Sequence, residues 1–419
     1  MQPVNAILPG GLAGAGFVTD ELLAPRQALV AFFSRVRPAS PSIERVPLDE
    51  AFGRVLAEQI DADDEYPNAA RSAMDGFALA AAAAPGDFAI IGEVRMGEAA
   101  DAAVAGAQAV RIPTGGLLPP GADAVVPIED VRISGSTLHV AGRVGPGENV
   151  IPRGADMHRG EPVLTPGRRI AAPQAGVLAT LGITDVPVYR RPIVGVLSSG
   201  DELVAPTARP KAGEVRDSNR YAVAASLRAM GAQPRHYARV ADESADFARA
   251  LSVALRECDA VAMTGGSSVG ERDRLPAAVD ALGKPGVVVH GLRVKPGKPA
   301  LLGAVGGKPI LGLPGNPTSA LLVLEAVAAP IVAALVGAPA LVATTAARLA
   351  QPARSRAGWT CFVPVALRND GGTPLAHPLP LRSFSVSLTA RADGYLVMDE
   401  REEEWPAGAT VTVHRFLGG

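Results

Sequence analysis

The chain has 419 residues, more than one hydrophobic core usually serves, so we expect it to fold into two to four domains. Its 40 lysines and arginines nearly balance its 42 aspartates and glutamates, which excludes the strongly basic composition of a nucleic-acid-binding protein. The two cysteines, Cys258 and Cys361, have neither disulfide nor zinc-ligand spacing, and this favours a reducing, cytoplasmic environment.

The first 18 residues are rich in glycine and small side chains, and we expect them to form a flexible leader. They lack the basic start and unbroken apolar run of a signal peptide. Farther along, the uncharged segment 326–346 is interrupted by Pro330, Gly337 and Pro339. These breaks favour a buried helix and its exit loop over a membrane span, so no membrane partner is predicted.

The N-terminal part of the chain predicts helices followed by strands. A helix is expected in RQALVAFFSRV after Pro25, and a second, short helix in LDEAFGRVLAEQI. From residue 61 to 157, short apolar or alternating segments stand between glycines and prolines. This pattern predicts a mostly β domain, inserted into a discontinuous helical and linker domain that covers residues 19–60 and 158–190.

Residues 191–338 alternate strand-like and helix-like segments joined by short loops. The segment PIVGVL is a continuous apolar run, as expected of a strand that is covered on both faces. This alternation predicts an α/β domain with a doubly wound parallel sheet. The last part, residues 339–419, returns to short strands and predicts a small C-terminal β domain.

Polar groups and glycine turns follow five strands predicted in the α/β domain. Ligands of open α/β sheets bind beyond the carboxyl ends of the strands, so these positions are predicted to form one ligand site. The positions are Ser199, Glu202, Asp242, Gly265, Gly266, Ser268, Asp273, Lys295, Lys298, Pro314, Gly315, Asn316 and Pro317. The glycine-rich loop TGGSSVG, taken alone, favours a strand-to-helix turn that binds nothing.

The residue types at this edge restrict the ligand. Lys295 and Lys298 stand in a proline-stiffened turn and suit an anion, and Pro317 at a helix start leaves N–H groups for an oxyanion. The acidic residues of the set repel an oxyanion unless a cation lies between, and without His or Cys nearby they suit Mg²⁺. The pattern predicts a nucleotide-like phosphate site with a metal. Each carboxylate taken singly is more typical of a solvated turn or a helix cap.

Two loops of the β domain also carry candidate site residues. The stretch RSAMDGFAL places Asp75 in a turn, and RIPTGGLLPPGADAVV places Thr114 before a glycine pair. Plain loop chemistry explains either loop alone. Both stand between well-formed strand patterns, however, where a linker would not be expected.

Together these stretches resemble the molybdopterin molybdenumtransferase (MoeA) family, including the E domain of gephyrin, from about residue 20 onward. The resemblance rests on SAMDGFA, IPTGGLLPPGADAVV, GENVIPRGADMHRGEPVL, SSGDEL, GEVRDSNR, TGGSSVGERD, VKPGKP and LPGNPTSA, in family order. It implies a MogA-like fold for the α/β domain. It also implies insertion of molybdate into the dithiolene of adenylylated molybdopterin with Mg²⁺, which releases AMP and molybdenum cofactor.

The resemblance further implies a homodimer, with the active cleft between one subunit's α/β domain and the partner's β domain. The implied protein partners are molybdopterin adenylyltransferase and molybdoenzyme maturation proteins. Two alternatives use the same fold: a scaffold protein that works by assembly, and an adenylyltransferase. The adenylyltransferase family carries TGGTG where this chain has TGGSS, which favours metal insertion.

Individual roles also follow from the resemblance. The implied catalytic residues are Asp75, Thr114, Glu202 and Asp273, and the implied metal ligands are Asp242, Asp273 and Glu202. The implied substrate-binding residues are Asp156, Ser199, Gly265, Gly266, Ser268, Lys295, Lys298, Pro314, Gly315, Asn316, Pro317 and Ser383. The chain departs from the family pattern at Arg382, where a glycine is usual, and at Trp359 and Pro364, where arginines are usual.

Overall fold

The computed structural model describes residues 22–98, 103–241, 244–265, 274–369, 371–380 and 382–418. The expected leader, residues 1–18, therefore lies outside the described residues. The chain forms two compact units. Unit 1 comprises Met1–Ala57, Gly167–Ala172 and Asp185–Gly419, and unit 2 comprises Glu58–Pro166 and Pro173–Thr184.

The central sheet of unit 1 has six strands in the order β16-β13-β17-β21-β20-β18. Their bounds are β13 (Ile193–Ser198), β16 (Gln233–His236), β17 (Ala260–Thr264), β18 (Pro285–His290), β20 (Leu301–Val305) and β21 (Lys308–Leu313). β16, β13, β17 and β21 run parallel. β20 is antiparallel to both β21 and β18, so β18 points the same way as the parallel strands. The carboxyl ends of five strands therefore meet at one edge.

The predicted doubly wound sheet is confirmed, and it contains one strand more than predicted. The sequence analysis does not predict β20, which forms a hairpin with β21 through Gly306 and Gly307. Both glycines have positive φ angles, +57° and +80°, as a two-residue hairpin turn of the favoured type requires.

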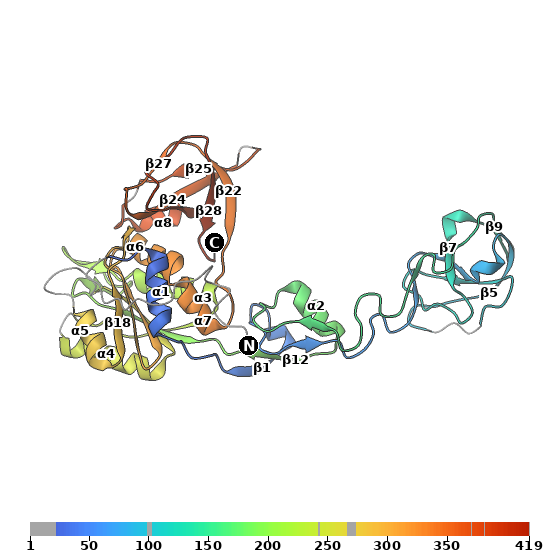
Figure 1. Ribbon diagram of the computed structural model, residues 1–419, viewed down its shortest axis with the longest axis horizontal. Helices are drawn as coiled ribbons and strands as arrows, with labels where there is room; N and C mark the ends of the chain where they lie inside the picture. Colours follow the sequence, from blue (N-terminus) through green and yellow to red (C-terminus); the bar gives the residue numbers. More distant parts are fainter. Residues whose placement is uncertain are drawn as a thin grey trace. The chain divides into compact units, whose positions relative to one another are not determined.

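Helices cover both faces of this sheet (Figure 1). One face is covered by α1 (Pro25–Arg35), α3 (Asn219–Met230), α6 (Pro317–Val323) and α7 (Ala329–Val336), and the other by α4 (Ser244–Glu257) and α5 (Leu275–Leu282). Along β17, Ala260 and Ala262 join the first core, whereas Val261 and Met263 join the second. Because both sets are buried, the strand reads as a continuous apolar run.

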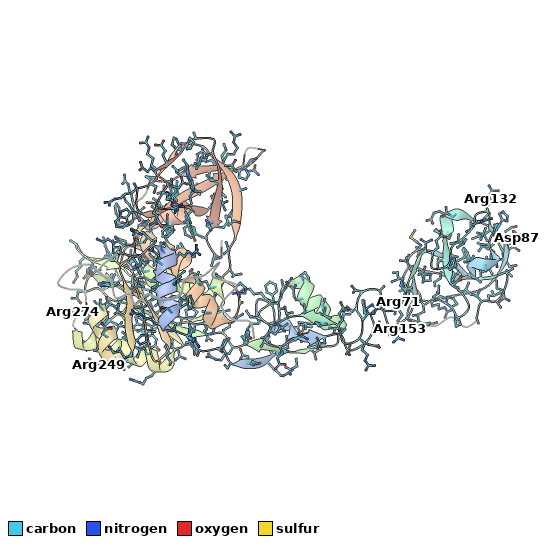
Figure 2. The ribbon with its side chains drawn as sticks, in the orientation of Figure 1. Arg71, Asp87, Arg132, Arg153, Arg249 and Arg274 are labelled. Carbon is cyan, nitrogen blue, oxygen red and sulfur yellow. The ribbon has the colours of Figure 1, made fainter. Side chains whose placement is uncertain are left out.

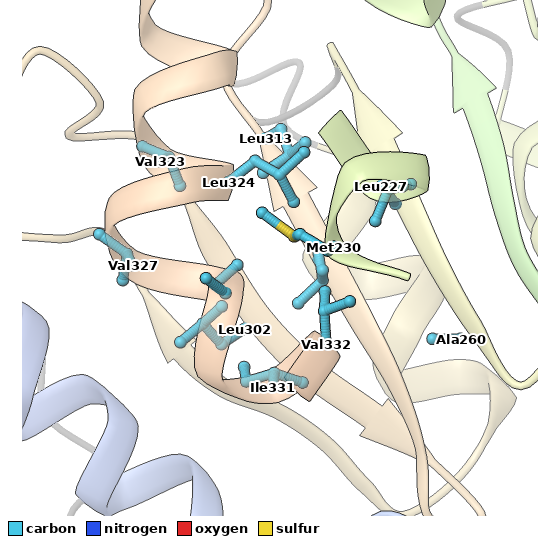
Figure 3. Packing of buried hydrophobic residues seen from close by; sticks show 14 of the residues in the cluster. Leu227, Met230, Ala260, Leu302, Leu313, Val323, Leu324, Val327, Ile331 and Val332 are labelled. Atoms are coloured by element: carbon cyan, nitrogen blue, oxygen red, sulfur yellow. The ribbon is translucent and has the colours of Figure 1, made fainter. Parts of the chain in front are cut away.

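The first core packs α3 against the long helix that ends the α/β part of unit 1. Met230 of α3 lies among Leu324, Ile331 and Val332 (Figure 3). The long helix runs over Pro317–Val336, with a π-helical segment, η4 (Leu324–Ala328), between α6 and α7. Among the described residues it alone is long and apolar enough to cross a membrane, but 78% of its most apolar window is buried in unit 1. The prediction of a buried helix is confirmed.

The second predicted helix of the N-terminal part is wrong. Only a 3-10 turn, η1 (Leu48–Glu50), forms in LDEAFGRVLAEQI. The chain then extends, with Leu56 bridging to Val188 beside the pair of β1 (Ile43–Pro47) and β12 (Asp185–Tyr189). Gly53 has a φ of +73°, which ends any helix there, and pairing with distant strands overrides the helical spacing of apolar residues.

Unit 2 is mostly β, as predicted. Its main sheet has the order β7-β4-β6-β5-β9-β8. The bounds are β4 (Gly76–Leu79), β5 (Gly86–Glu93), β6 (Gln108–Ile112), β7 (Ala124–Pro127), β8 (Val131–Ser134) and β9 (Thr137–Val140). Apolar side chains on the two faces form two small cores, and exposed side chains such as Asp87 and Arg132 project outward (Figure 2).

Short elements complete unit 2. They are β2 (Ile60–Asp61), β3 (Arg71–Ser72), η2 (Ala81–Ala83), η3 (Ile128–Asp130), β10 (Val150–Ile151), β11 (Pro162–Leu164) and α2 (Ala172–Thr180), the last beginning at the boundary with unit 1. β3 pairs with β10, and β2 pairs with β11. The β3–β10 pair connects the loop that precedes β4 to the segment around Asn149.

The C-terminal part of unit 1 is a small barrel. Its strands are β22 (Thr344–Leu349), β24 (Thr360–Arg368), β25 (Leu375–Pro378), β26 (Gly394–Met398) and β28 (Thr410–Arg415). They follow the order β24-β25-β22-β28-β26, and β26 also pairs with β24, which closes the ring. Minor elements are β14 (Leu203–Val204), β15 (Val215–Arg216), β19 (Val294–Lys295), β23 (Ala353–Arg354), β27 (Glu404–Trp405) and α8 (Val386–Arg391).

Candidate functional site

The carboxyl ends of neighbouring strands in unit 1 are connected by main-chain hydrogen bonds. The N–H of Ser199, after β13, donates to the carbonyl of Thr264 on β17 at 2.9 Å. The N–H of Gly265 donates to the carbonyl of Leu313 on β21 at 3.3 Å, and that of Val240 donates to Ser198 at 2.9 Å. These bonds hold the loops that follow the strands at one place, which we call the strand-end edge.

Gly265 can only be a glycine at this edge. Its φ is +85°, a region that other residues rarely adopt, and a Cβ there would lie 2.3 Å from the carbonyl oxygen of Ser199. The next loop is equally close, because a Cβ on Gly315 would lie 3.8 Å from the Cα of Gly265. The predicted residues Ser199, Gly265 and Gly315 are therefore adjacent.

The LPGNP loop leads into α6 and also contacts the barrel. The side-chain amide of Asn316 donates to the Ser383 hydroxyl at 3.3 Å, and the Thr318 hydroxyl donates to the carbonyl of Ser385 at 3.1 Å. Pro317 is the first residue of α6 and has no N–H. Ser383, predicted from the resemblance alone, thus lies beside the loop that carries Pro314, Gly315, Asn316 and Pro317.

Glu202 lies in the turn that follows β13. A Cβ on Gly200 would be 2.7 Å from both carboxylate oxygens of Glu202, so the carboxylate folds back over the glycine. Arg239 supports this turn: its guanidinium donates to the carbonyl of Gly200 at 2.8 Å and lies 3.7 Å from the Asp201 carboxylate. The sequence analysis misses Arg239, because no motif or spacing connects it to SSGDEL.

Lys295 and Lys298 are exposed in a turn held on two sides. A Cβ on Gly297 would lie 2.4 Å from the side chain of Val323, so the turn packs directly on the helix that begins at Pro317. On the other side, Lys295 pairs in parallel with Cys361 of the barrel strand β24. The turn follows β18, whose carboxyl end lies at the strand-end edge.

Asn219 is a second residue that the sequence analysis misses. It begins α3 and is 8% exposed, and its side-chain nitrogen donates to the carbonyl of Gly315 at 2.6 Å. Asn219 lies in the motif GEVRDSNR, which is part of the family resemblance. The resemblance assigns no role to this motif, so Asn219 was not predicted.

In unit 2, Thr114 binds Asp75 through two donors. Its backbone N–H and its hydroxyl donate to the same carboxylate oxygen, Oδ1, at 2.6 Å and 2.9 Å. The backbone hydrogen bond first, and the hydroxyl second, lower the pKa of the Asp75 carboxyl. The loops SAMDG and IPTGG are thus brought together, and Asp75 is an ionised acceptor near neutral pH. Asp156 lies in another turn of unit 2, where its N–H donates to the carbonyl of Tyr66.

Four predicted residues lie outside the described residues: Asp242, Gly266, Ser268 and Asp273. They follow Ala241 and Gly265 in the chain, and both of these neighbours are described. The described residues contain no group of three His, Cys, Asp or Glu side chains able to hold a metal ion. Two of the three expected metal ligands are among the four undescribed residues, so the magnesium site stays a prediction.

A separate cavity of about 660 Å³ lies elsewhere in unit 1, between the long helix and the barrel. Its walls include Glu325, Phe362 and Tyr395, and none of the predicted site residues lines it. Burial raises the pKa of Glu325 to about 7, although the Ser226 hydroxyl and the Leu417 N–H both donate to its carboxylate. This cavity is therefore distinct from the strand-end edge.

Three family models match consecutive parts of the chain. They are the MoeA N-terminal region (domain I and II) over residues 23–182, a probable molybdopterin binding domain over residues 195–334, and the MoeA C-terminal region (domain IV) over residues 346–416. The third model includes Ser383, and the second covers the loops of the strand-end edge.

Curated relatives and solved structures agree with these matches. A molybdopterin molybdenumtransferase of Bacillus subtilis is 32% identical over 384 residues, which is 88% of this chain and 89% of the relative. One from Synechocystis is 31% identical over 86% of this chain and 92% of the relative. A crystal structure of the molybdopterin biosynthesis MoeA protein from Pyrococcus horikoshii OT3 is 27% identical, with a TM-score of 0.84, and covers 94% of this chain and 100% of that one. The chain belongs to the molybdopterin molybdenumtransferase (MoeA) family.

Proposed function

We propose that this protein inserts molybdate into the dithiolene of adenylylated molybdopterin, releasing AMP and molybdenum cofactor. The curated relatives are named for this activity, and this chain matches most of their length. The observation that carries the proposal is the strand-end edge, where Ser199, Gly265, Gly315 and Ser383 lie in adjoining loops. Glycines at the centre let a phosphate-bearing ligand approach the backbone closely.

The cationic part of the proposed site holds the phosphate groups. Lys295 and Lys298 are exposed on a turn that Gly297 anchors against the long helix, so their stems start from a fixed position. That helix begins at Pro317. The free N–H groups of its first turn point out of the helix N-terminus, where the helix dipole favours an anion. Together they balance the negative charge of a diphosphate ester and of molybdate.

In this proposal Glu202 supplies one ligand of a magnesium ion. Glu202 presents an exposed carboxylate beside Asp201, and Mg²⁺ prefers such oxygen ligands. With Asp242 and Asp273 as further ligands, the ion would withdraw charge from the phosphate that leaves with AMP. In this proposal Glu202 orients the ion and substrate, while the lysines and helix N-terminus bind the remaining oxygens.

Asp75 and Thr114 supply an acceptor for the proton-transfer or molybdate-orienting step. The two hydrogen bonds from Thr114 lower the pKa of the Asp75 carboxyl and hold one of its oxygens, which leaves the other oxygen for the substrate. We propose that the protein is a homodimer in which the unit 2 of one subunit supplies this pair to unit 1 of the other, with Asp156 contributing to substrate binding.

Mixing two inactive variants tests both the reaction and the dimer. Asp75→Asn and Glu202→Gln each alter one unit, and each homodimer is expected to release little AMP from adenylylated molybdopterin with molybdate and Mg²⁺. A heterodimer formed from both variants contains one site with all carboxylates intact, so it should recover up to about half of the wild-type rate per dimer. Wild-type protein that releases no AMP would contradict the reaction, and mixed variants that stay inactive would contradict only the shared site.

The cellular setting follows as part of the same proposal. The substrate is an adenylylated pterin, so a molybdopterin adenylyltransferase supplies it, and molybdoenzyme maturation proteins consume the product. The two cysteines of the chain are both buried and free, which is compatible with the reducing cytoplasm that we propose as its location.

A further inference from the structure

Two buried polar atoms at the strand-end edge have no hydrogen-bond partner among the described residues. They are the hydroxyl oxygen Oγ of Ser199 and the side-chain oxygen Oδ1 of Asn219. The two side chains are 4% and 8% exposed, respectively. Buried polar atoms are nearly always hydrogen-bonded in folded proteins, so such a pair at a candidate site indicates that a bound group completes it.

The contact of Asn219 with Gly315 fixes which way its amide faces. The backbone carbonyl of Gly315 only accepts hydrogen bonds, so the atom of Asn219 at 2.6 Å from it must be the nitrogen. The oxygen Oδ1 therefore faces away from Gly315. An amide oxygen is only an acceptor, so its missing partner must be an N–H or O–H donor.

The two unpartnered atoms belong to the same set of adjoining loops. Ser199 is in direct contact with Gly265, and Gly265 is in turn next to Gly315, to which Asn219 is bound. Asn219 is also the first residue of α3, so the helix packed on the first core holds it in place.

We propose that Asn219 Oδ1 and Ser199 Oγ form a subsite that receives an N–H or O–H donor from the organic part of the substrate. This inference rests on the proposed function and names the chemistry that one part of its site recognises. The oxygens of the substrate's diphosphate diester and of molybdate carry no proton at neutral pH, so they offer Asn219 Oδ1 no hydrogen. The donor comes either from the nucleoside, with its hydroxyl and amino groups, or from the pterin, with its ring N–H and amino groups.

Calorimetric titration of the full-length protein with three probes tests the subsite. The probes are AMP, 6-hydroxymethylpterin and inorganic pyrophosphate, and only the first two carry the N–H and O–H donors of a nucleoside or a pterin. Asn219→Ala is expected to weaken the binding of one donor-bearing probe about tenfold more than it weakens pyrophosphate binding. The probe affected identifies the source, nucleoside or pterin. Ser199→Ala should weaken the same probe, and it provides the test should Asn219→Ala fail to fold.

Ser226→Ala is the matched control. Ser226 also lies on α3 and is buried, but its hydroxyl donates to Glu325, away from the strand-end edge. This variant should lose some thermal stability and bind all three probes as the wild type does. Equal weakening of all three probes by Asn219→Ala, or no weakening at all, would overturn the subsite. Wild-type protein that binds neither AMP nor the pterin would refute the proposed function itself.

Discussion

The side-chain amide of Asn316 donates to the hydroxyl of Ser383 at 3.3 Å, across 67 residues of sequence. Asn316 stands at the start of the long core helix, and Ser383 precedes α8 in the barrel part of unit 1. The contact brings a barrel residue to the loop that follows β21. The barrel is thereby a wall of the proposed site as well as a stabilising neighbour of the α/β sheet.

Ser383→Ala is expected to lower kcat/KM for adenylylated molybdopterin about three- to tenfold, because it removes a hydroxyl that contacts Asn316 and that we propose to contact the substrate. The melting temperature should stay within about a degree, since Ser383 is only half-buried. Ser387→Ala is the matched control, because its hydroxyl contacts Arg391 on the exposed side of α8. Equal rates for the two variants would remove Ser383 from the substrate site.

Gly265→Ala is expected to reduce both stability and activity. A Cβ at this position would lie 2.3 Å from the Ser199 carbonyl oxygen, so the loops after β13 and β17 must separate. We expect a loss of about 1–3 kcal/mol in the free energy of unfolding and at least a hundredfold loss in AMP release. Urea denaturation and the AMP assay measure the two effects.

Gly213→Ala separates the clash from the backbone strain. Gly213 also has a positive φ, +89°, but a Cβ there meets no atom within 4 Å. This variant should therefore lose about 1 kcal/mol of stability and keep near-normal activity. A similar loss of activity in both variants would mean that the close approach of Gly265 to Ser199 has no special role.

Thr114→Val should raise the pKa of Asp75 toward its ordinary value of 3.8, because the hydroxyl donor is lost while the backbone donor remains. The wild-type pKa is lowered, so Asp75 keeps its charge at every pH above that value and loses it only as the pH falls through the lowered pKa. Any acidic limb of the activity profile near pH 6 must then come from another group. NMR titration of the Asp75 carboxyl carbon measures the shift. Thr137→Val, at an exposed position of β9 in unit 2, is the control.

Much of the strand-end edge was predictable from local patterns. The runs PIVGVL and DAVAM are apolar throughout because each strand is buried on both faces, and the polar turn after each run marks its carboxyl end. Only one strand of this sheet, β20, is missed. The pair Gly306-Gly307 between two apolar segments is a hairpin signal that a search for alternating strands and helices passes over.

Other features depend on contacts that no local pattern contains. Asn219 donates a hydrogen bond to the carbonyl of Gly315, and Arg239 donates one to the carbonyl of Gly200. Each acceptor is distant from its donor in the sequence. Many polar residues of the sequence could have filled these roles, so only the fold identifies them. The predicted helix after Leu48 is wrong for a related reason: strand pairing with β12 competes successfully with a helical pattern that a glycine already weakens.

Glu325 makes the stability of unit 1 depend on pH. Its pKa is raised from 4.5 to about 7, chiefly by burial, so the folded protein holds a proton that the unfolded chain releases near pH 4.5. Stability should therefore be highest below pH 4.5 as far as this group is concerned, and it should fall as the pH rises from 4.5 through 7, by up to about 3 kcal/mol. The glutamine of a Glu325→Gln variant cannot ionise, so the stability of the variant should not fall over this pH range. The substitution also weakens one of the two hydrogen bonds donated to this side chain, from Ser226 or Leu417. Urea midpoints of both proteins between pH 5 and 8 measure the difference. A wild-type midpoint that stays parallel to that of the variant over this range would show that the buried carboxyl titrates at its ordinary pKa.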